Sequence, residues 1–431
     1  MSVLLPVVRP RLSVLVSLCL GALIAAGCQS QPPTPSVQTG AEVLAANDFQ
    51  ALDGARVGLI VNHTARVDTA HLIDRIARAP NVELGALFGP EHGLRGTAGA
   101  GEKIADGRDE RTGAPIYSLY GDTPRPTPDE MADLDALVFD VQDVGARFYT
   151  YITTMGLAMQ AAAEADLRFV VLDRPNPLGG RYVSGFMMES AHQSFVGRYP
   201  IPIAHGMTVG ELARFIKAEE LLPGLQDLDL TVVSMRGWSR NMTWPDTKRE
   251  WVPPSPNLPT WETALVYPGM CFFEGVRVNE GRGTDQPFLQ IGLPWGQRAA
   301  SAVAETLQSR SLPGVSFDTT TFTPTSRPHA APSPRFEGQT LHGFRLRITD
   351  HDEVRPVALG VHALHAVYQQ AQAERDTAFV SRPEHLTRLI GTRQLRTLLE
   401  QGASPDSIIA SWQEDIARFR DRRRPHLLYG N

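Results

Sequence analysis

The first half of the chain alternates short apolar runs with segments of helical periodicity, and this alternation limits the fold more than any other feature. The apolar runs are each long enough for one strand and cover residues 55–62, 83–89, 135–141, 168–173 and 228–235. The helical patterns between them cover residues 69–79, 151–166 and 208–219. Apolar strands separated by helices are typical of a parallel sheet covered on both faces. We therefore expect an α/β fold, with a Rossmann-like, doubly wound domain over residues 45–258.

A Pro-rich stretch, "WVPPSPNLPTWET", follows the last of these strands and marks the expected domain boundary. Its prolines favour stiff, extended backbone rather than a floppy linker. We expect residues 259–431 to form a smaller α+β domain that closes the active-site cleft. Strands are predicted in "ALVYPGMCFFEGVRV" and "FRLRITD", and helices in "PVALGVHALHAVYQQAQ", "PEHLTRLIG", "TRQLRTLLEQG" and "SPDSIIASWQEDIARFRDRRRP".

The N-terminus has the pattern of an export signal. Arg9 and Arg11 precede an apolar segment that is too short for a membrane span, and Gly27 and Cys28 follow it. The "AAGC" ending resembles a bacterial lipobox, in which the cysteine becomes the first residue of the mature chain and carries lipid. We expect a lipoprotein-type signal peptide over residues 1–28 and a flexible tether over residues 29–44. The protein would then be exported and lipid-anchored to a bacterial membrane, facing the periplasm; ordinary cleavage is the alternative.

Composition excludes several other classes. A net charge of -6 without a basic stripe argues against nucleic acid as a partner, and a mean hydropathy of -0.17 excludes a polytopic membrane protein. Cys19 leaves with the signal and Cys28 is the lipidation site, so Cys271 stands alone and no disulfide is expected. Cys271 lies in an apolar run and is predicted to be a buried structural thiol.

Polar side chains directly follow four of the predicted strands. They are Asn62, His63 and Thr64 after the first, Glu91 and His92 after the second, Gln142, Asp143, Arg147, Tyr149 and Tyr151 after the third, and Arg174 and Asn176 after the fourth. In open parallel sheets the ligand binds beyond the carboxyl ends of the strands. We therefore expect these clusters to converge on one cleft.

The motifs of common cofactor sites are absent from this cleft. No Gly-x-Gly-x-x-Gly follows the first strand, and the chain contains neither a P-loop motif nor a Gly-x-Ser-x-Gly elbow. Potential metal ligands are present but have no His-x-His or His-Glu-x-x-His spacing; they are His63, His92, Asp140, Asp143 and His205. We therefore expect neither a metal nor another cofactor.

A carboxyl group acting as acid or base is the remaining chemistry. Glu91 is suited to donate a proton, because Pro90 and Gly93 constrain its turn and its apolar neighbours would raise its pKa by desolvation. Glycoside hydrolysis needs such a donor and usually a second carboxylate. On the residues alone, a structural role for Glu91, capping the turn or pairing with Arg95, is equally plausible.

A second polar cluster lies in "VRVNEGRGTDQPF" of the second domain. Asn279, Glu280 and Arg282 are predicted on a glycine-flanked turn after a strand, where the backbone can approach a ligand closely. A solvent-facing hairpin turn is the alternative. Both this turn and that of Glu91 could line a cleft between the domains.

These motifs resemble one known family. "GLIVNHTA", "FGPEHGLRG", "VFDVQDVGARFYTYI", "LDRPNPLGG", "PIAHGMTVGELA", "PPSPNLPT" and "NEGRGTDQPF" are similar to those of the NamZ-type exo-β-N-acetylmuramidases, from about residue 52 to the closing "RPHLLYGN". The resemblance implies a glycosidase that removes N-acetylmuramic acid from the non-reducing ends of peptidoglycan-derived muropeptides or disaccharides. It also implies a Rossmann-like domain, a smaller C-terminal domain and an active site at their interface.

The resemblance makes Glu91 the catalytic residue. Asp143, Glu280 or the 2-acetamido oxygen of the substrate would be the second catalytic group. The predicted substrate-binding residues are Asn62, His92, Arg95, Arg147, Tyr149, Tyr151, Arg174, Asn176 and Arg282. The lactyl carboxylate of muramic acid needs a cation, for which an arginine is the natural partner. Two other functions remain open: a lipid-anchored muropeptide-binding protein without turnover, and a metal-dependent hydrolase of another substrate.

Overall fold

The computed structural model describes residues 1–4, 36–91, 93–94, 107–121 and 124–430. Our predictions for Cys28, His92 and Arg95, and for most of the signal peptide and tether, lie outside these residues. Residues 36–431 form one compact unit. Within the described ranges, no helix is both long and apolar enough to cross a membrane.

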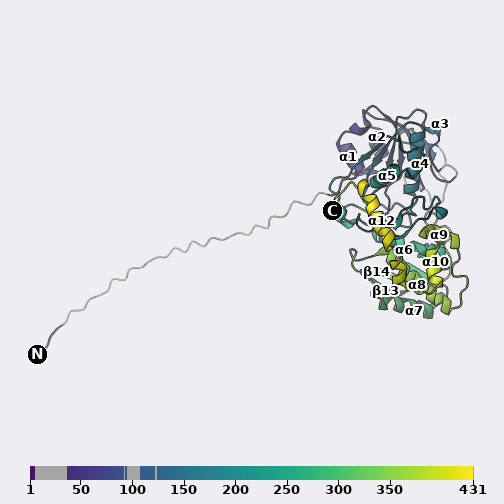
Figure 1. Cartoon of the computed structure of the whole chain (residues 1–431). Coiled ribbons are helices and arrows are strands. Elements are labelled where there is room, and N and C mark those ends of the chain that lie inside the picture. The colour runs from purple at the N-terminus through teal and green to yellow at the C-terminus, as the bar shows by residue number, and fades with distance from the viewer. Residues whose placement is uncertain (5–35, 92, 95–106, 122–123, 431) are drawn as a thin grey trace. The chain divides into compact units, whose positions relative to one another are not determined.

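A seven-stranded sheet organises the first part of this unit, which we call the sheet lobe (residues 36–258; Figure 1). The strand order is β11-β8-β7-β1-β4-β6-β5, and every neighbouring pair is parallel except β5 and β6. The strands are β1 Arg56–Val61, β4 Glu83–Gly89, β5 Gly107–Arg108, β6 Pro115–Ser118, β7 Ala136–Asp140, β8 Arg168–Leu172 and β11 Leu230–Val233. The chain order reverses between β1 and β7, as in doubly wound Rossmann-like sheets. The predicted fold class is confirmed.

Helices cover both faces of this sheet. They are α1 Gly40–Ala46, α2 Leu72–Ile76, α3 Pro128–Met131, α4 Tyr151–Glu164 and α5 Val209–Ala218. Neighbouring residues of β1 show the two faces: Ile60 belongs to the core that includes α4 and α5, whereas Leu59 and Val61 belong to the core that includes α1 and α2. The predicted cap of α5 is confirmed, because Thr208 and Glu211 form a capping box.

Two segments near the start of the lobe differ from expectation. The folded unit begins at Ser36 rather than at residue 45, because Thr39 caps α1 and Val37 and Leu44 are buried. The helix predicted over residues 69–79 is short, since β3 (Ala70–His71) pairs with β2 (Arg66–Val67) and takes up its first residues. A further antiparallel pair, β9 (Ser184–Met187) and β10 (Pro202–Ala204), lies outside the main sheet.

Most of the remaining chain, residues 259–430, we call the C-terminal lobe. It has a three-stranded antiparallel sheet of order β12-β14-β13, formed by β12 Gln290–Leu293, β13 Val315–Phe322 and β14 Leu341–Ile348. Its helices are α6 Trp261–Met270, α7 Gln297–Ser309, α8 Pro356–Ala373, α9 Pro383–Ile390, α10 Gln394–Glu400, α11 Pro405–Ala410 and α12 Gln413–Arg423. The single helix predicted over residues 404–425 is therefore two helices.

The strand predicted in "ALVYPGMCFFEGVRV" is wrong: the segment forms α6 and a short 3-10 helix, η4 (Cys271–Gly275). The Thr260 side chain accepts a hydrogen bond from the Thr263 amide and caps α6. Because α6 is buried on nearly all sides, its sequence has no polar face to reveal helical periodicity. Cys271 is buried, as predicted.

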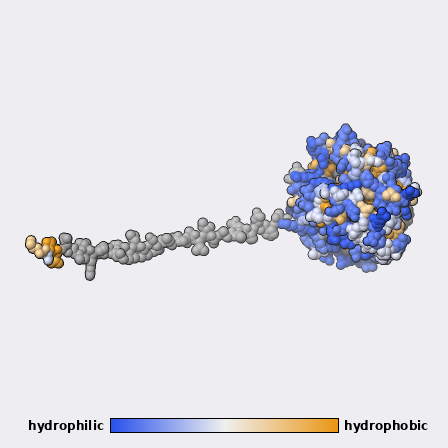
Figure 2. Space-filling model, turned by 90° about the horizontal axis from the view of Figure 1, so that it is seen from below, coloured by the Kyte–Doolittle hydropathy of each residue, from blue (hydrophilic) through white to orange (hydrophobic). Residues whose placement is uncertain are grey.

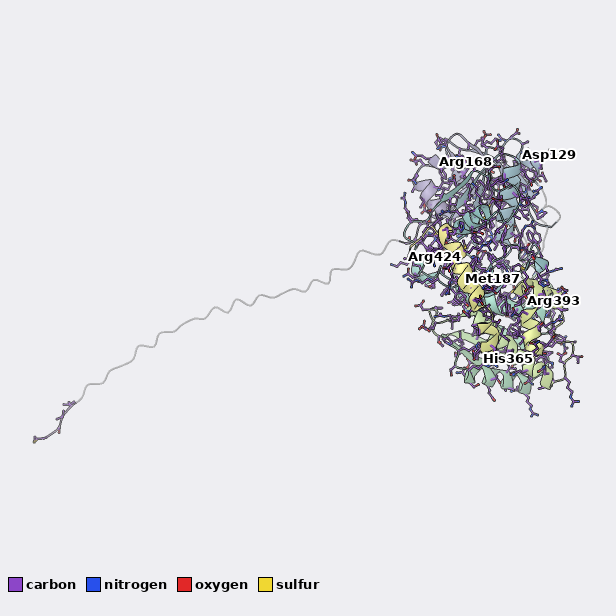
Figure 3. All side chains as sticks on the ribbon, viewed as in Figure 1. Asp129, Arg168, Met187, His365, Arg393 and Arg424 are labelled. Carbon is purple, nitrogen blue, oxygen red and sulfur yellow. The ribbon has the colours of Figure 1, made fainter. Side chains whose placement is uncertain are left out.

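The carboxyl ends of the parallel strands face the C-terminal lobe. Arg168, the first residue of β8, lies at the end of the sheet lobe far from His365 in the C-terminal lobe (Figure 3). The end of the chain returns to the sheet lobe, where the Tyr429 hydroxyl donates to Asp173 Oδ2 over 2.5 Å and the Leu428 amide donates to Glu211 Oε1 over 2.9 Å. The face seen in Figure 2 is mostly hydrophilic, with only scattered hydrophobic areas.

Candidate active site

The turn after β4 carries Glu91. The Gly93 amide donates to the Pro90 carbonyl over 3.0 Å, and Gly93 has a φ of +74°, which favours glycine. Leu87, Phe88 and Leu94 are buried beside the turn, whereas Glu91 itself is half-buried. The predicted constrained turn with an apolar base is therefore confirmed, and it presents Glu91 at the carboxyl edge of the sheet.

Two tyrosine hydroxyls lie against Glu91. The Tyr120 hydroxyl forms a hydrogen bond with the Glu91 side chain; burial and the charge of Glu91 both raise the pKa of Tyr120. The Tyr151 hydroxyl lies 3.3 Å from the main-chain oxygen of Glu91 and 3.0 Å from that of Pro254. It also accepts a hydrogen bond from Asn62 Nδ2 over 3.2 Å. Residues that follow β1, β4, β6 and β7 thus meet at the Glu91 turn.

Tyr120 was not predicted from the sequence. It follows β6, a strand of four half-buried residues that lies between β4 and the edge strand β5 and has no strong apolar run. The signal was nevertheless present, because "PIYSLY" ends in a polar aromatic residue as the other strands end in polar clusters. Recognising the strand would have placed Tyr120 at the same edge of the sheet.

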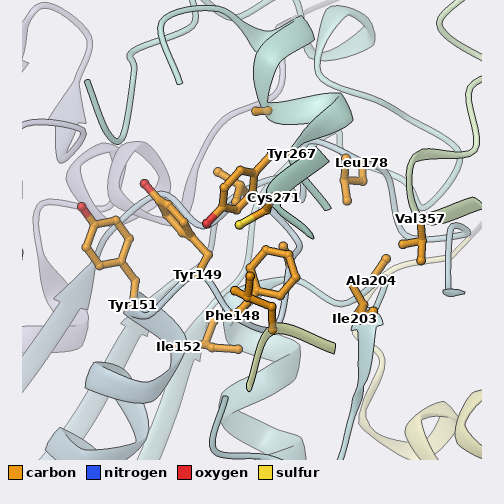
Figure 4. Close-up of a cluster of buried hydrophobic side chains, with 14 of the residues drawn as sticks. Phe148, Tyr149, Tyr151, Ile152, Leu178, Ile203, Ala204, Tyr267, Cys271 and Val357 are labelled. Carbon is orange, nitrogen blue, oxygen red and sulfur yellow. The ribbon is translucent and has the colours of Figure 1, made fainter. Parts of the chain in front are cut away.

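Tyr151, Tyr149 and Tyr267 form a row of rings (Figure 4). Tyr151, at one end of the row, contacts the main chain of Glu91. The centroids of Tyr149 and Tyr151 are 4.9 Å apart, and those of Tyr149 and Tyr267 are 5.9 Å apart, in edge-to-face geometry. The Tyr149 hydroxyl is buried and has no hydrogen-bond partner among the residues that the structure describes. Burial raises the pKa of Tyr149, and the neighbouring tyrosines and the charges of Glu91 and Asp143 add to this effect. Both carboxyl groups therefore act on the same tyrosine.

Asp143 lies in a buried polar pocket behind this row. Its Oδ2 accepts from the Gly145 amide over 2.7 Å, while its Oδ1 has no partner within the described chain. Burial raises the pKa of Asp143 to about 7. His205 Nε2 lies 3.8 Å from Asp143 Oδ2, and burial lowers the pKa of His205 to about 3, so this imidazole is neutral at neutral pH.

The second cluster, at Glu280 and Arg282, is also buried. Arg282 forms ion pairs with Glu274 Oε1 over 2.7 Å and with Glu280 Oε1 over 3.2 Å. Burial raises the pKa of Glu280, and its Oε2 has no partner among the described atoms. His385 Nε2 lies 3.1 Å from Glu274 Oε2. The cluster follows η4 and irregular chain rather than the strand that we predicted, and it is no solvent-facing hairpin.

Aromatic rings connect the two clusters. The guanidinium carbon of Arg282 lies 5.2 Å from the centroid of the Phe288 ring, and the Phe288 and Tyr267 rings are 5.1 Å apart. Tyr267 in turn contacts Tyr149. Contacts therefore run continuously from Glu91 in the sheet lobe to Glu280 in the C-terminal lobe. This is the arrangement expected of a site between the two lobes.

Three of the predicted binding residues are engaged within the fold. Arg147 is buried and donates to the carbonyls of Phe186, Ile201, Leu389 and Ile390 over 2.7–2.9 Å. Arg174 forms a buried bidentate ion pair with Asp140. The Asn176 side chain donates to the Met207 carbonyl and accepts from the Leu178 amide. This geometry favours a positioning role for these three residues over direct contact with a substrate.

No group of histidine, cysteine and acidic side chains is arranged to hold a metal ion within the described ranges. The acid–base groups at the switch edge of the parallel sheet are carboxyls and tyrosines. Fold and site together define a class: an α/β enzyme of two lobes with carboxyl groups between them.

The chain belongs to the NamZ exo-β-N-acetylmuramidase family. The family description "Exo-beta-N-acetylmuramidase NamZ, N-terminal" matches residues 57–262, and "Exo-beta-N-acetylmuramidase NamZ, C-terminal" matches residues 265–429. The chain is 43% identical over 400 residues to the peptidoglycan β-N-acetylmuramidase NamZ of Bacillus subtilis (strain 168), covering 92% of each chain. The family predicted from the motifs is confirmed.

Two solved structures of DUF1343 family proteins from Bacteroides fragilis NCTC 9343 share the fold. One superposes with a TM-score of 0.83 and the other with 0.76. Each is 35% identical to this chain, and each match covers 92% of this chain and 100% of the other.

Proposed function

We propose that this protein is an exo-β-N-acetylmuramidase that releases N-acetylmuramic acid from the non-reducing ends of peptidoglycan fragments. The observation that carries the proposal is the Glu91 turn, which holds a half-buried carboxyl at the switch edge, in a chain of the NamZ family. The same membership gives no support to a binding protein without turnover or to a metal-dependent hydrolase of another substrate.

Glu91 is the acid and base of the proposed reaction. Cleavage of a glycosidic bond requires a proton on the leaving oxygen, and a half-buried carboxyl can supply it and later accept one from water. The hydrogen bond from Tyr120 orients the Glu91 side chain, while Tyr151 and Asn62 orient its backbone. The buried rings of Tyr149 and Tyr151 pack edge to face and hold the Tyr151 hydroxyl against the turn.

The second catalytic group is Asp143, Glu280 or the substrate's own 2-acetamido oxygen. Asp143 and Glu280 each keep one buried carboxyl oxygen without a partner in the described chain. Burial makes Asp143 neutral below about pH 7, which favours hydrogen-bond donation over nucleophilic attack there. The separation of the carboxyl groups in a substrate complex decides between these routes.

The test is the release of N-acetylmuramic acid from a chromogenic β-N-acetylmuramide. Glu91→Gln keeps the shape and removes the titratable proton, so kcat should fall by about 10²–10⁴-fold. Glu83→Gln, at the opposite end of β4, is the matched control and should retain activity. EDTA should have no effect. Full activity of Glu91→Gln would refute the assigned role.

We further propose that the protein is exported and anchored by lipid at Cys28, facing the periplasm. The support is the basic start, the short apolar segment and the "AAGC" sequence before a Pro-rich stretch. Full-length protein expressed in bacteria should incorporate labelled palmitate and partition into detergent, whereas Cys28→Ala should do neither. Unlabelled wild-type protein would contradict the anchor.

A further inference from the structure

A cavity of about 460 Å³ opens beside the candidate site at the carboxyl end of β1. The side chains that concern us line its wall: His63, Arg66, His71, Asp74, Arg78 and Arg111. They come from the chain after β1, from the β2–β3 pair, from α2 and from the chain after β5. Nothing in the proposed reaction uses this cavity.

A short series of contacts joins the cavity to Glu91. The Tyr151 hydroxyl, which contacts Glu91, also lies 3.0 Å from the Pro254 carbonyl. The preceding carbonyl, that of Pro253, accepts a hydrogen bond from His63 Nε2 over 2.6 Å. His63 then forms part of the cavity wall. Tyr151, Pro253 and Pro254 therefore connect Glu91 to the cavity wall at His63.

The cavity has an excess of positive charge. Arg111 is paired with Asp74 over 2.6 Å, but neither Arg66 nor Arg78 forms an ion pair with any residue that the structure describes. Both of these arginines are solvent-exposed, so their guanidinium groups can meet a ligand without breaking an internal bond. Arginine binds carboxylates in bidentate geometry, which makes an anionic occupant the natural one.

The hydrogen bond of His63 determines which of its ring nitrogens carries the proton. Its Nε2 must carry the proton, because the partner is a carbonyl oxygen, which can only accept. Its Nδ1 is therefore an acceptor; this atom is buried and has no partner in the described chain. The neutral Nδ1 would accept from a hydroxyl or N–H group of the same ligand.

We propose that this cavity binds a carboxylate of the muramic acid substituent, which is the lactyl group or the peptide attached to it, and that Arg66 forms the ion pair with this carboxylate. The proposal rests on the proposed function. Its support is the state of the three arginines predicted to bind substrate that the structure describes: Arg147 and Arg174 are engaged in buried interactions, and Arg282 is paired with two glutamates. The carboxylate is that of the lactyl group itself or, in a fragment that carries peptide, an acidic side chain of that peptide.

The test compares the binding of N-acetylmuramic acid and N-acetylglucosamine, which differ only in the lactyl ether. In calorimetry, Arg66→Gln should weaken the binding of N-acetylmuramic acid by about 10-fold or more, and leave N-acetylglucosamine unchanged. Arg75→Gln is the matched control: Arg75 lies on the same helix as Asp74, pairs with Asp68 and does not line the cavity. Added salt should weaken wild-type binding of N-acetylmuramic acid and have little effect on Arg66→Gln.

A disaccharide with peptide on its lactyl group separates the two sources of carboxylate. If Arg66→Gln weakens only the binding of this fragment, the peptide is the occupant; if it also weakens binding of the free sugar, the lactyl group is. Equal affinity of wild type and Arg66→Gln for every ligand would overturn the proposal. Because binding is measured directly, loss of the cavity's role is distinguishable from loss of muramidase activity, which the chromogenic assay reports.

Discussion

At the residue scale, Asp143 shows how burial determines protonation. It is buried, and its neighbour His205 is neutral, so this imidazole does not compensate the charge that ionisation would create. The folded protein therefore binds the Asp143 proton more tightly than the unfolded chain does. This difference links the free energy of unfolding to pH.

We expect the Asp143 contribution to be fully present below about pH 4 and to be lost by about pH 7, a change of up to about 4 kcal/mol. Asp143→Asn cannot ionise, so the wild type should lose stability relative to this variant as pH rises through that window. Urea unfolding of both proteins over a pH series measures the difference in the free energy of unfolding. His205 changes stability with pH in the opposite direction, but it is present in both proteins, so its effect largely cancels in the comparison. Parallel stability curves would contradict the raised pKa.

At the scale of elements, a strand or helix was predictable where its pattern differed from its surroundings. The parallel strands β1, β4, β7 and β8 are apolar runs between polar turns, and all four were placed within about two residues. The sequence of α6 predicted a strand because this helix is apolar on every side, and β6 was not predicted because its half-buried residues form no apolar run.

The same rule applies to the site. Glu91 was predicted because it follows a clear strand, whereas Tyr120 was not predicted because its strand, β6, was not recognised. The partners of Arg147 and Arg174 could not be predicted, because packing distant in sequence decides which arginine remains available.

The contact of α6 with α8 gives a prediction at this scale. A Cβ on Gly360 would lie 2.4 Å from the backbone of Gly269, so Gly360→Ala must push the helices apart. We expect the free energy of unfolding to fall by about 1–3 kcal/mol. Gly430→Ala is the control, since a Cβ at that residue meets nothing within 4 Å. Equal denaturation midpoints for the two variants would show that α6 and α8 can accommodate a methyl group at Gly360.

At the scale of the whole molecule, Arg147 ties the two lobes together. Its guanidinium donates to Phe186 and Ile201 in the sheet lobe and to Leu389 and Ile390 in the C-terminal lobe. The motif resemblance predicted that Arg147 binds the substrate. Its hydrogen bonds to four carbonyls instead indicate that it connects the two lobes beside the site. The boundary near residue 258 stays a prediction, because residues 36–431 form one compact unit.

Arg147→Met should therefore destabilise the lobe contact. The substitution keeps much of the apolar stem but leaves buried carbonyls without donors, at a cost of about 1–3 kcal/mol for each unsatisfied group. Chemical denaturation should show a large loss of stability and a less cooperative transition than that of Arg388→Met, a neighbouring exposed arginine. Unchanged cooperativity would assign the lobe contact to other residues.

The returning C-terminus has a consequence for how the molecule is made. Tyr429 and Leu428 supply hydrogen bonds to Asp173 and Glu211, buried acids of the sheet lobe. Until residues 428 and 429 have been made, these donors are missing, so the sheet lobe cannot reach its final state before the C-terminal lobe has been synthesised, although domains generally fold in order from the N-terminus. The lobe that is made first is therefore the one completed last.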